Sequence, residues 1–348
     1  MKPGDEIVAI EGKPTPYWLE RFGRNISSDN AYLEATLLEL GFAGEVWTEM
    51  GPRENLALTI LRDGASRDVR VGTIDRATLN QRMESAEATG FSLDTSSRIA
   101  EVLEGGIAYL RPGPFYGVET PDAMWDDTAF SAFIDESFEM FLEADAQALL
   151  IDMRQNPGGD NSFSDQMIAW FADETFRFAS EFLVRSSPQS QASNQARLDA
   201  YAEAAEGVSG LFAQSYEATP YGETFSFEIP FARPRNGARF EGPVFAMIDR
   251  YSYSNTTNVA ALLQDYGFAT ILGEETSDLA TTYGAMESFT LPHSGLVVGY
   301  PKALIIRPSG DMAPRGVVPD IAIEAPLFAQ DDVVLERAME IVRKETDL

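Results

Sequence analysis

Two stretches decide the fold: LLIDMRQNPGG at residues 149–159 and VFAMIDRYSYSNTTNVAALLQDYG at residues 244–267. Each begins with an apolar run that favours a buried strand, continues through a turn of small and polar residues, and leads into a pattern that predicts a helix. Such a turn directs the first backbone N–H groups of the helix toward one point, and the second stretch adds a serine hydroxyl. The two stretches therefore predict an α/β domain with an anion or oxyanion site.

The composition indicates a globular protein and excludes several kinds of catalytic and metal site. With 348 residues, 44% of them hydrophobic, the chain is long enough for two domains. No apolar run reaches the ~18 residues of a membrane span, and residues 1–25 hold no stretch of signal-peptide type. The lack of cysteine excludes disulfides and thiol catalysis, and the single histidine, His293, excludes a multi-histidine metal site. We expect neither a metal nor a cofactor.

The charge balance is strongly acidic. Asp and Glu number 55 against 26 Lys and Arg, which gives a net charge of −29. The basic residues include just four lysines: Lys2, Lys13, Lys302 and Lys344. Such a surface repels phosphate backbones and anionic headgroups, so we expect no nucleic-acid partner and no anionic membrane partner.

The pattern of elements divides the chain. Residues 1–75 predict a mainly β unit, in which NLALTILRDGASRDVRVGTI supplies two alternating strands joined by Asp63-Gly64. Residues 76–97 are polar and predict a linker with some helix. Residues 98–348 predict the larger α/β domain, and its Ser-, Gln- and Ala-rich segment at 186–218 predicts a helical insertion or lid.

The turns of the two opening stretches carry the candidate site residues. Gly158 and Gly159 would allow backbone amides to approach a ligand closely. Ser254 would stand where a strand turns into a helix, with the N–H of Asn255 beside it, so the serine could act as a nucleophile and the amides as an oxyanion hole. From the residues alone, an ordinary strand-to-helix turn is the favoured explanation for the glycines and helix capping the favoured one for Ser254.

The order of short motifs resembles the C-terminal processing (tail-specific) serine proteases and their tricorn-like relatives. The resemblance covers residues 98–324 and rests on D-x-R-x-N-x-G-G at 152–159, S-x-S at 252–254, Q-D-Y-G at 264–267, G-E-x-T at 273–276 and G-V-x-P-D-I at 316–321. The stretch PGDEIVAIEGKP at 3–14 resembles part of a PDZ domain, without the preceding strand and peptide-binding loop. The resemblance implies a crotonase-like β-β-α superhelix preceded by a partial PDZ-like unit.

This resemblance also implies an activity. The second serine of the S-x-S turn is the nucleophile in the family, and it corresponds to Ser254. The amides of Gly158 or Gly159 and of Asn255 would then bind the oxyanion. We expect a serine endopeptidase that acts on peptides or on unfolded protein C-terminal tails, recruited by strand addition to the PDZ-like unit. A periplasmic or secreted location is expected because such relatives are commonly exported.

The general base departs from the family pattern. The best-known members use a lysine 25 residues after the serine, where this chain has Leu279, and no lysine lies between Lys13 and Lys302. The tricorn-like branch uses a histidine ahead of the PDZ unit and an acidic residue near the C-terminal end. Here His293 falls in a predicted exposed hairpin tip. Asp311 stands at the position of the supporting acid, with a solvated loop carboxylate as its alternative.

Two hypotheses account for the missing base. The chain opens inside a PDZ-like unit, so an N-terminal segment that carries the base could have been lost. Alternatively, the protein is a pseudoprotease that keeps the cleft and binds peptides. A third interpretation, a crotonase-like acyl-CoA enzyme, is disfavoured by the PDZ-like unit, the serine turn and the acidic charge. We expect the chain by itself to be inactive.

Overall fold

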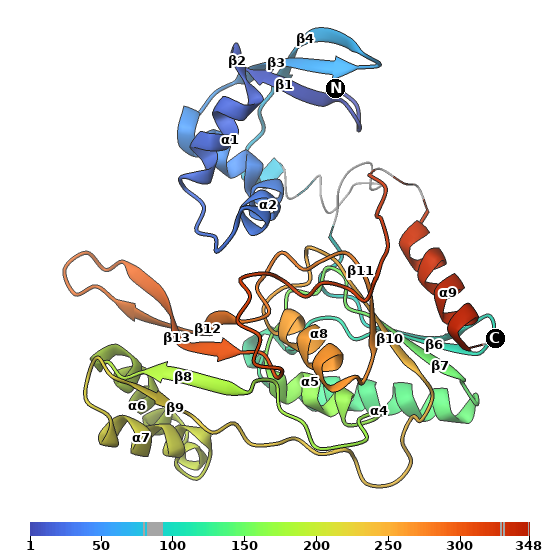
Figure 1. Cartoon of the computed structure of the whole chain (residues 1–348). Coiled ribbons are helices and arrows are strands. Elements are labelled where there is room, and N and C mark those ends of the chain that lie inside the picture. The colour runs from blue at the N-terminus through green and yellow to red at the C-terminus, as the bar shows by residue number, and fades with distance from the viewer. Residues whose placement is uncertain (79–80, 82–92, 328, 330, 347) are drawn as a thin grey trace. The chain divides into compact units, whose positions relative to one another are not determined.

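The computed structural model describes residues 1–78, 81, 93–327, 329, 331–346 and 348 (Figure 1). The chain divides into two compact units, Met1–Thr95 with Ile323–Ile341 and Ser96–Ala322 with Val342–Leu348. The linker predicted at 76–97 falls largely on residues 79–80 and 82–92, outside the described residues, and the predicted domain boundaries stay predictions. Within the described ranges, no helix combines the length and the apolar character that crossing a bilayer requires.

The smaller unit is built on an antiparallel sheet of order β2-β1-β3-β4. Its elements are β1 (Glu6–Ile10), β2 (Lys13–Pro14), α1 (Thr15–Gly23), α2 (Ala31–Met50), β3 (Asn55–Arg62) and β4 (Ala65–Gly72). Glu11-Gly12 and Asp63-Gly64 form the two turns, and all four residues have φ between 48° and 74°. Positive φ at both central positions is typical of type I′ hairpin turns. The predicted strands are confirmed, whereas the likeness to a PDZ domain stays a prediction.

The larger unit contains a six-stranded sheet of order β14-β11-β10-β7-β6-β5. Strands β6, β7, β10, β11 and β14 run parallel, and β5 is antiparallel to β6. The strands are β5 (Ile99–Leu103), β6 (Ile107–Arg111), β7 (Ala148–Asp152), β10 (Val244–Ile248), β11 (Thr270–Gly273) and β14 (Ile321–Ala322). The helices are η1 (Pro121–Ala123), α4 (Thr128–Glu143), α5 (Asn161–Ile168) and α8 (Asn255–Tyr266), while α9 (Val333–Thr346) continues from the residues of one unit into those of the other.

Burial explains the apolar runs of the two central strands. Every residue of β7 and β10 is buried, as expected for parallel strands covered on both faces. Helix α4 contributes Phe130, Ile134, Phe138 and Phe141 to the same core, and their spacing in the sequence is typical of one apolar helix face. Phe138 stacks on Trp170 with 5.0 Å between ring centroids. The apolar segments around β7 and β10 therefore build one core about the parallel strands, separate from the clusters of the second sheet and of the smaller unit.

A second, antiparallel sheet of the larger unit has the order β12-β13-β8-β9. Its strands are β8 (Glu181–Arg185), β9 (Thr224–Ser226), β12 (Thr282–Thr290) and β13 (Val297–Ile306). The segment 186–218 contains α6 (Pro188–Ala200), η2 (Ala202–Ala205) and α7 (Val208–Ala218). Residues 303–306 of β13 pair with β8, and the hairpin of β12 and β13 extends beyond them (Figure 1).

Three neighbouring strands of the parallel sheet end at one edge. β7 pairs with β10, and β10 pairs with β11, all in the same direction. The loops at residues 153–160, 249–254 and 274–281 leave the carboxyl ends of these three strands. Ligands of open α/β sheets bind outside the carboxyl ends of the strands. These three loops therefore define the candidate site.

A buried ion pair joins α8 to the segment that follows β13. Arg307 is 7% exposed, and its Nε and Nη2 donate to the two carboxylate oxygens of Asp265 at 2.9 and 2.7 Å. Its Nη2 also donates to Oε1 of Gln264 at 3.1 Å. The Q-D-Y-G motif is thereby explained as a structural element that anchors α8.

Replacing Arg307 with Met should lower the free energy of unfolding of the larger unit by about 3–5 kcal/mol, because the buried Asp265 carboxylate loses its guanidinium. Urea unfolding followed by circular dichroism measures this change. Glu104→Gln is the matched control, since Glu104 is 95% exposed and 4.0 Å from Arg343. The control should leave stability nearly unchanged. Equal effects of the two substitutions would contradict the structural role of the buried pair.

Candidate active site

Ser254 lies on an abrupt turn from β10 into α8. Its backbone has φ 56° and ψ −123°, a conformation that residues other than glycine rarely adopt. The residue is exposed, whereas β10 is buried throughout. Within the part of the chain that the structure describes, the Ser254 side chain makes no capping hydrogen bond to α8, although it occupies the N-cap position. Helix capping therefore does not account for this serine.

The backbone conformation of Ser254 has a cost. A residue held in such a sparsely populated region carries on the order of 1–3 kcal/mol of strain, and such residues cluster at functional sites. A strained turn from a strand into a helix is also the geometry by which hydrolases expose a nucleophilic serine. The positive end of the helix dipole lies beside the hydroxyl and favours a developing negative charge there.

Gly158 and Gly159 bring the loop after β7 against the serine turn. A Cβ on Gly158 would lie 2.8 Å from Cβ of Ser254 and 2.6 Å from the carbonyl oxygen of Tyr253. A Cβ on Gly159 would lie 2.0 Å from the carbonyl oxygen of Phe115. The φ angles of the two glycines are 94° and 143°, so both space and backbone conformation require glycine. The structure thus brings the two opening stretches of sequence into contact.

The N–H groups around this contact are not equivalent. The N–H of Gly158 donates to Oδ1 of Asn156 at 2.9 Å and is occupied. Phe115 and Gly159 form an isolated β-bridge, in which the N–H of Phe115 donates to the carbonyl of Gly158 at 2.9 Å. Among the described residues, the N–H groups of Gly159 and Asn255 have no hydrogen-bond acceptor. These two groups are the open backbone donors at the glycine loop and at the start of α8 within the described ranges.

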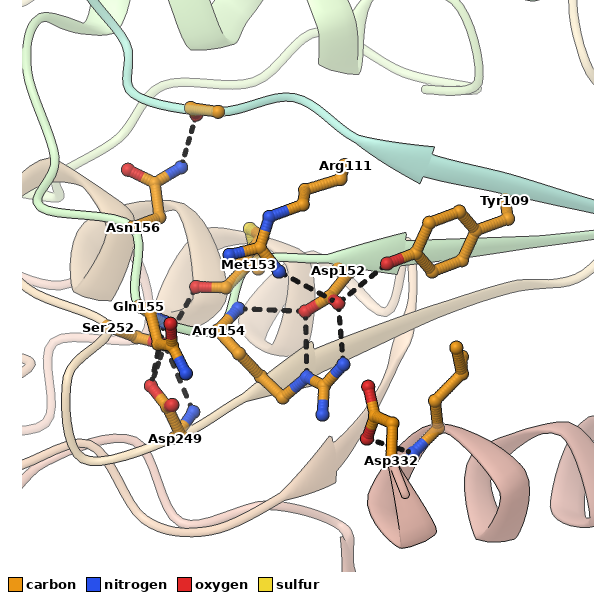
Figure 2. Close-up of polar contacts among 12 residues, drawn as sticks. Tyr109, Arg111, Asp152, Met153, Arg154, Gln155, Asn156, Asp249, Ser252 and Asp332 are labelled. Atoms are coloured by element: carbon orange, nitrogen blue, oxygen red, sulfur yellow. Dashed lines mark hydrogen bonds and ion pairs between the residues drawn. The ribbon is translucent and has the colours of Figure 1, made fainter. Parts of the chain in front are cut away.

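Asp249 and Ser252 tie the two loops together (Figure 2). Oδ1 of Asp249 accepts the N–H groups of Gln155 and Tyr251, each at 3.0 Å. The hydroxyl of Ser252 is fully buried and donates to the carbonyl of Met153 at 2.9 Å. The first serine of the S-x-S motif is therefore structural. Burial raises the pKa of Asp249 to about 6, although the N–H of Gln155 favours its charged form.

Asp152 fixes the end of β7, from which the glycine loop departs. Nε and Nη2 of Arg154 donate to its two oxygens at 2.9 and 2.7 Å. Arg111 Nη1 and the Tyr109 hydroxyl donate to Oδ2 of the same carboxylate at 3.1 and 2.8 Å (Figure 2). Burial, followed by the negative charge of Asp152, raises the pKa of Tyr109, so its hydroxyl remains a donor. The D-x-R part of the motif is explained by this network.

A carboxylate that the sequence analysis did not single out contacts the serine turn. Asp278 is 6% exposed, and its Oδ2 accepts the N–H of Ser254 at 2.7 Å. The one available signal was its place two residues after Thr276, at the end of the G-E-x-T motif. That signal is weak, because aspartate is common in loops of any function.

Neither Leu279, at the position of the family's lysine, nor Lys302 offers a free amine near Ser254 as a base. Leu279 is 7% exposed and cannot exchange a proton. Lys302 belongs to β13 of the second sheet, where its Nζ lies 2.7 Å from Oε1 of Glu287 and 4.5 Å from the ring centroid of Phe212. Burial lowers the pKa of Lys302, while Glu287 opposes that change. The ammonium group of Lys302 is thus bound within the second sheet.

His293 and Asp311 lie on exposed loops. His293 is part of the turn between β12 and β13, at residues 291–296. Oδ1 of Asp311 accepts the N–H of Ala313 at 2.9 Å, and its carbonyl accepts the hydroxyl of Thr281 at 2.6 Å. The first contact belongs to a local turn, and the second joins the Asp311 segment to the loop after β11, 30 residues away. The role of Asp311 as a supporting acid stays a prediction.

Replacing Ser254 with Gly should raise the free energy of unfolding by about 1–2 kcal/mol, because glycine adopts this backbone conformation without strain. Urea unfolding measures the effect. Ser288→Gly is the control, since Ser288 is exposed on β12, and glycine weakens a strand. A loss of stability in Ser254→Gly would show that the turn is not strained.

Asp165 is a buried carboxyl on α5, the helix that begins just after the glycine loop. Its Oδ1 has no hydrogen-bond partner among the described residues, and its Oδ2 accepts Nδ2 of Asn161 at 3.3 Å. Burial raises the pKa of Asp165 to about 7, opposed by the hydrogen bond from Asn161. The charged form is therefore unfavourable at this position.

This raised pKa predicts how stability depends on pH. Between about pH 4 and 7 the folded state keeps a proton on Asp165 that the unfolded state releases, so the free energy of unfolding falls as the pH rises through that window. Asp165→Asn removes the effect and should be more stable than the wild type at pH 8, by at most about 4 kcal/mol, with no advantage near pH 4. Urea unfolding across this range provides the measurement. Asp173→Asn, at an exposed site of the same unit, should show no such trend. A pH-independent difference for Asp165→Asn would rule the account out.

Comparison with known proteins places this geometry in context. A family model described as Peptidase family S41 matches residues 117–323, which is more than half of the chain. No curated protein matches the sequence.

Among solved structures, mature CPAF is similar with a TM-score of 0.65 and 17% identity, over 100% of this chain and 77% of that chain. CPAF complexed with lactacystin gives 0.62 and 16%, over 99% and 77%. The photosystem II D1 C-terminal processing protease is a weaker match, with a TM-score of 0.45 and 15% identity over 96% and 67%. At 16–17% identity, the likeness to the CPAF structures shows the fold alone, and it confirms the predicted α/β protease fold.

Proposed function

This chain belongs to peptidase family S41, and from that membership we propose that it is a serine endopeptidase whose nucleophile is Ser254. Family membership supports a serine-type peptidase and a peptide or protein substrate. The assignment of Ser254 rests on one observation: it is an exposed serine with φ 56° on a strand-to-helix turn, and its side chain does not cap the helix that follows. Neither packing nor capping explains that strain, whereas a nucleophile does.

In the proposed reaction, each of these groups has one role in hydrolysis of the peptide bond. The Ser254 hydroxyl attacks the substrate carbonyl carbon, and the carbonyl oxygen becomes an oxyanion. The N–H groups of Gly159 and Asn255 stabilise that oxyanion, since the N–H of Gly158 is already bound to Asn156. Collapse of the intermediate expels the amine and leaves an acyl-enzyme on Ser254, which water then hydrolyses.

The proton of the hydroxyl needs an acceptor. Leu279 stands at the position of the family's lysine, and Lys302 is bound to Glu287. We propose that the base comes from sequence outside residues 1–348, as in the tricorn-like branch that the motifs resemble. Asp311 is the proposed supporting acid of such a base.

Extended peptides or unfolded C-terminal tails are the proposed substrates. The antiparallel sheet of the smaller unit ends in β4, an edge strand to which a peptide could add. The net charge of −29 favours neutral or basic segments over acidic ones. An exported location is proposed with this substrate class.

A second candidate function is peptide binding without catalysis. It is favoured by the specific finding that the two lysine positions open to the family's mechanism, Leu279 and Lys302, offer no free amine. A cleft with open N–H donors can still bind a peptide carbonyl. The two functions differ in whether the Ser254 hydroxyl reacts.

In a preparation whose wild type hydrolyses peptides, Ser254→Ala should abolish both peptide hydrolysis and labelling by a fluorophosphonate probe, because each requires the serine oxygen. Its unfolding curve should match the wild type, since alanine is held in the same backbone conformation. Ser288→Ala, at an exposed serine of β12, is the matched control and should keep wild-type labelling.

The outcomes separate the two functions. Hydrolysis or labelling that survives in Ser254→Ala would overturn the assignment of the nucleophile. A wild type that binds peptide but neither hydrolyses it nor reacts, even when expressed with its genomic upstream sequence, would support the pseudoprotease.

A further inference from the structure

The loop after β11 forms a tight turn that is anchored to a distant segment. The hydroxyl of Thr276 is fully buried, donates to the carbonyl of Asp278 at 2.9 Å and accepts the N–H of Val317 at 2.9 Å. A Cβ on Gly316 would lie 1.9 Å from the carbonyl oxygen of Thr276, so the two segments pack backbone against backbone. The G-E-x-T and G-V-x-P-D-I motifs thereby hold residues 276–278 in one position.

This turn places the carboxylate of Asp278 against the backbone of Ser254. Oδ2 of Asp278 accepts the N–H of Ser254 at 2.7 Å, and Oδ1 accepts the N–H of Leu279 at 3.0 Å. Hydrogen bonds from a backbone N–H to a carboxylate are stronger than those between neutral groups, and more so at a site that is 6% exposed. The contact holds the Ser254 amide plane, which is the group that must rotate if the residue leaves its strained conformation.

We propose that Asp278 is a positioning residue that holds Ser254 in the strained conformation from which its hydroxyl reacts. The inference rests on the proposed function of Ser254. The Ser254 N–H that Asp278 holds lies one residue before the N–H of Asn255, which is the proposed oxyanion donor. One carboxylate therefore anchors the backbone of the nucleophile directly beside that donor.

The geometry requires a carboxylate and not merely a polar side chain. The two N–H groups, of Ser254 and Leu279, each need an acceptor, and asparagine has one acceptor oxygen and an NH₂ donor. Asp278→Asn must therefore leave one of the two N–H groups facing a donor, with little change in volume. This makes it a sharper probe than truncation to alanine.

Asp320 provides a matched control in the same unit. Its Oδ2 accepts the N–H of Ile271 at 2.8 Å and its Oδ1 accepts Nε2 of Gln264 at 3.0 Å. Asp320→Asn thus removes the same kind of bond at the start of β11, the opposite end of that strand from the Asp278 turn. Because Asp320 is exposed and Asp278 is buried, Asp278→Asn should lose the more stability. The catalytic constants are therefore compared per folded molecule, so that a difference in kcat reports the position of the carboxylate.

The first test measures the backbone and needs no turnover. Hydrogen exchange of the Ser254 amide, followed by NMR on the whole chain, should be slow in the wild type and in Asp320→Asn, and at least about tenfold faster in Asp278→Asn. Equal exchange rates in all three proteins would overturn the inference.

The second test measures catalysis on a peptide substrate. Asp278→Asn should lower kcat by about tenfold or more with KM changed by less than about twofold, because the lost orientation acts in the transition state. Asp320→Asn should keep both constants within about twofold of the wild type. Wild-type kcat in Asp278→Asn would overturn the positioning role. A wild type without turnover or labelling would instead defeat the proposed function, and the exchange measurement would still decide whether Asp278 holds the Ser254 backbone.

Discussion

The candidate site depends on direct backbone contact between two loops, for which only glycine is small enough. The backbone of Gly158 lies against the Ser254 turn, and that of Gly159 lies against Phe115. The clamp through Asp249 and Ser252 holds the two loops at this separation. A methyl group added at Gly158 would force the two loops apart, and one added at Gly159 would displace the loop after β7 from Phe115.

Three unfavourable features of the larger unit belong to the elements that form this contact or lead directly from it. Ser254 has a strained backbone, and two nearby carboxyl groups, Asp165 and Asp249, have pKa values raised by burial. The site is stabilised in compensation by the Arg154–Asp152 pair and by the buried core of parallel strands. This is the distribution expected when a site is selected for reactivity within a fold that can tolerate its cost.

The sequence predicts the elements that depend on local pattern. The apolar strands β7 and β10, the helix α4 and the Asp63-Gly64 hairpin follow from periodicity and turn chemistry, and the motif order indicates the family. It does not distinguish the N–H of Gly158 from that of Gly159, because the distinction depends on where the Asn156 amide points. Nor does it identify Asp278, whose contact with Ser254 spans 24 residues and depends on a turn anchored by Val317. Those features arise from tertiary packing between segments that no local pattern relates.

The order of the strands has a consequence for how the protein acquires its site. The hydrogen bond from Gln155 to Asp249 joins residues 94 positions apart, because strands β8 and β9 of the second sheet and the helices α5, α6 and α7 lie between β7 and β10 in the chain. Closing so long a loop is entropically costly, and contacts of this separation form late in folding. During synthesis the Gly158 loop emerges well before the serine, and the strained turn cannot form until the parallel sheet is complete. An unfinished chain therefore lacks the assembled turn that holds Ser254 in its strained conformation.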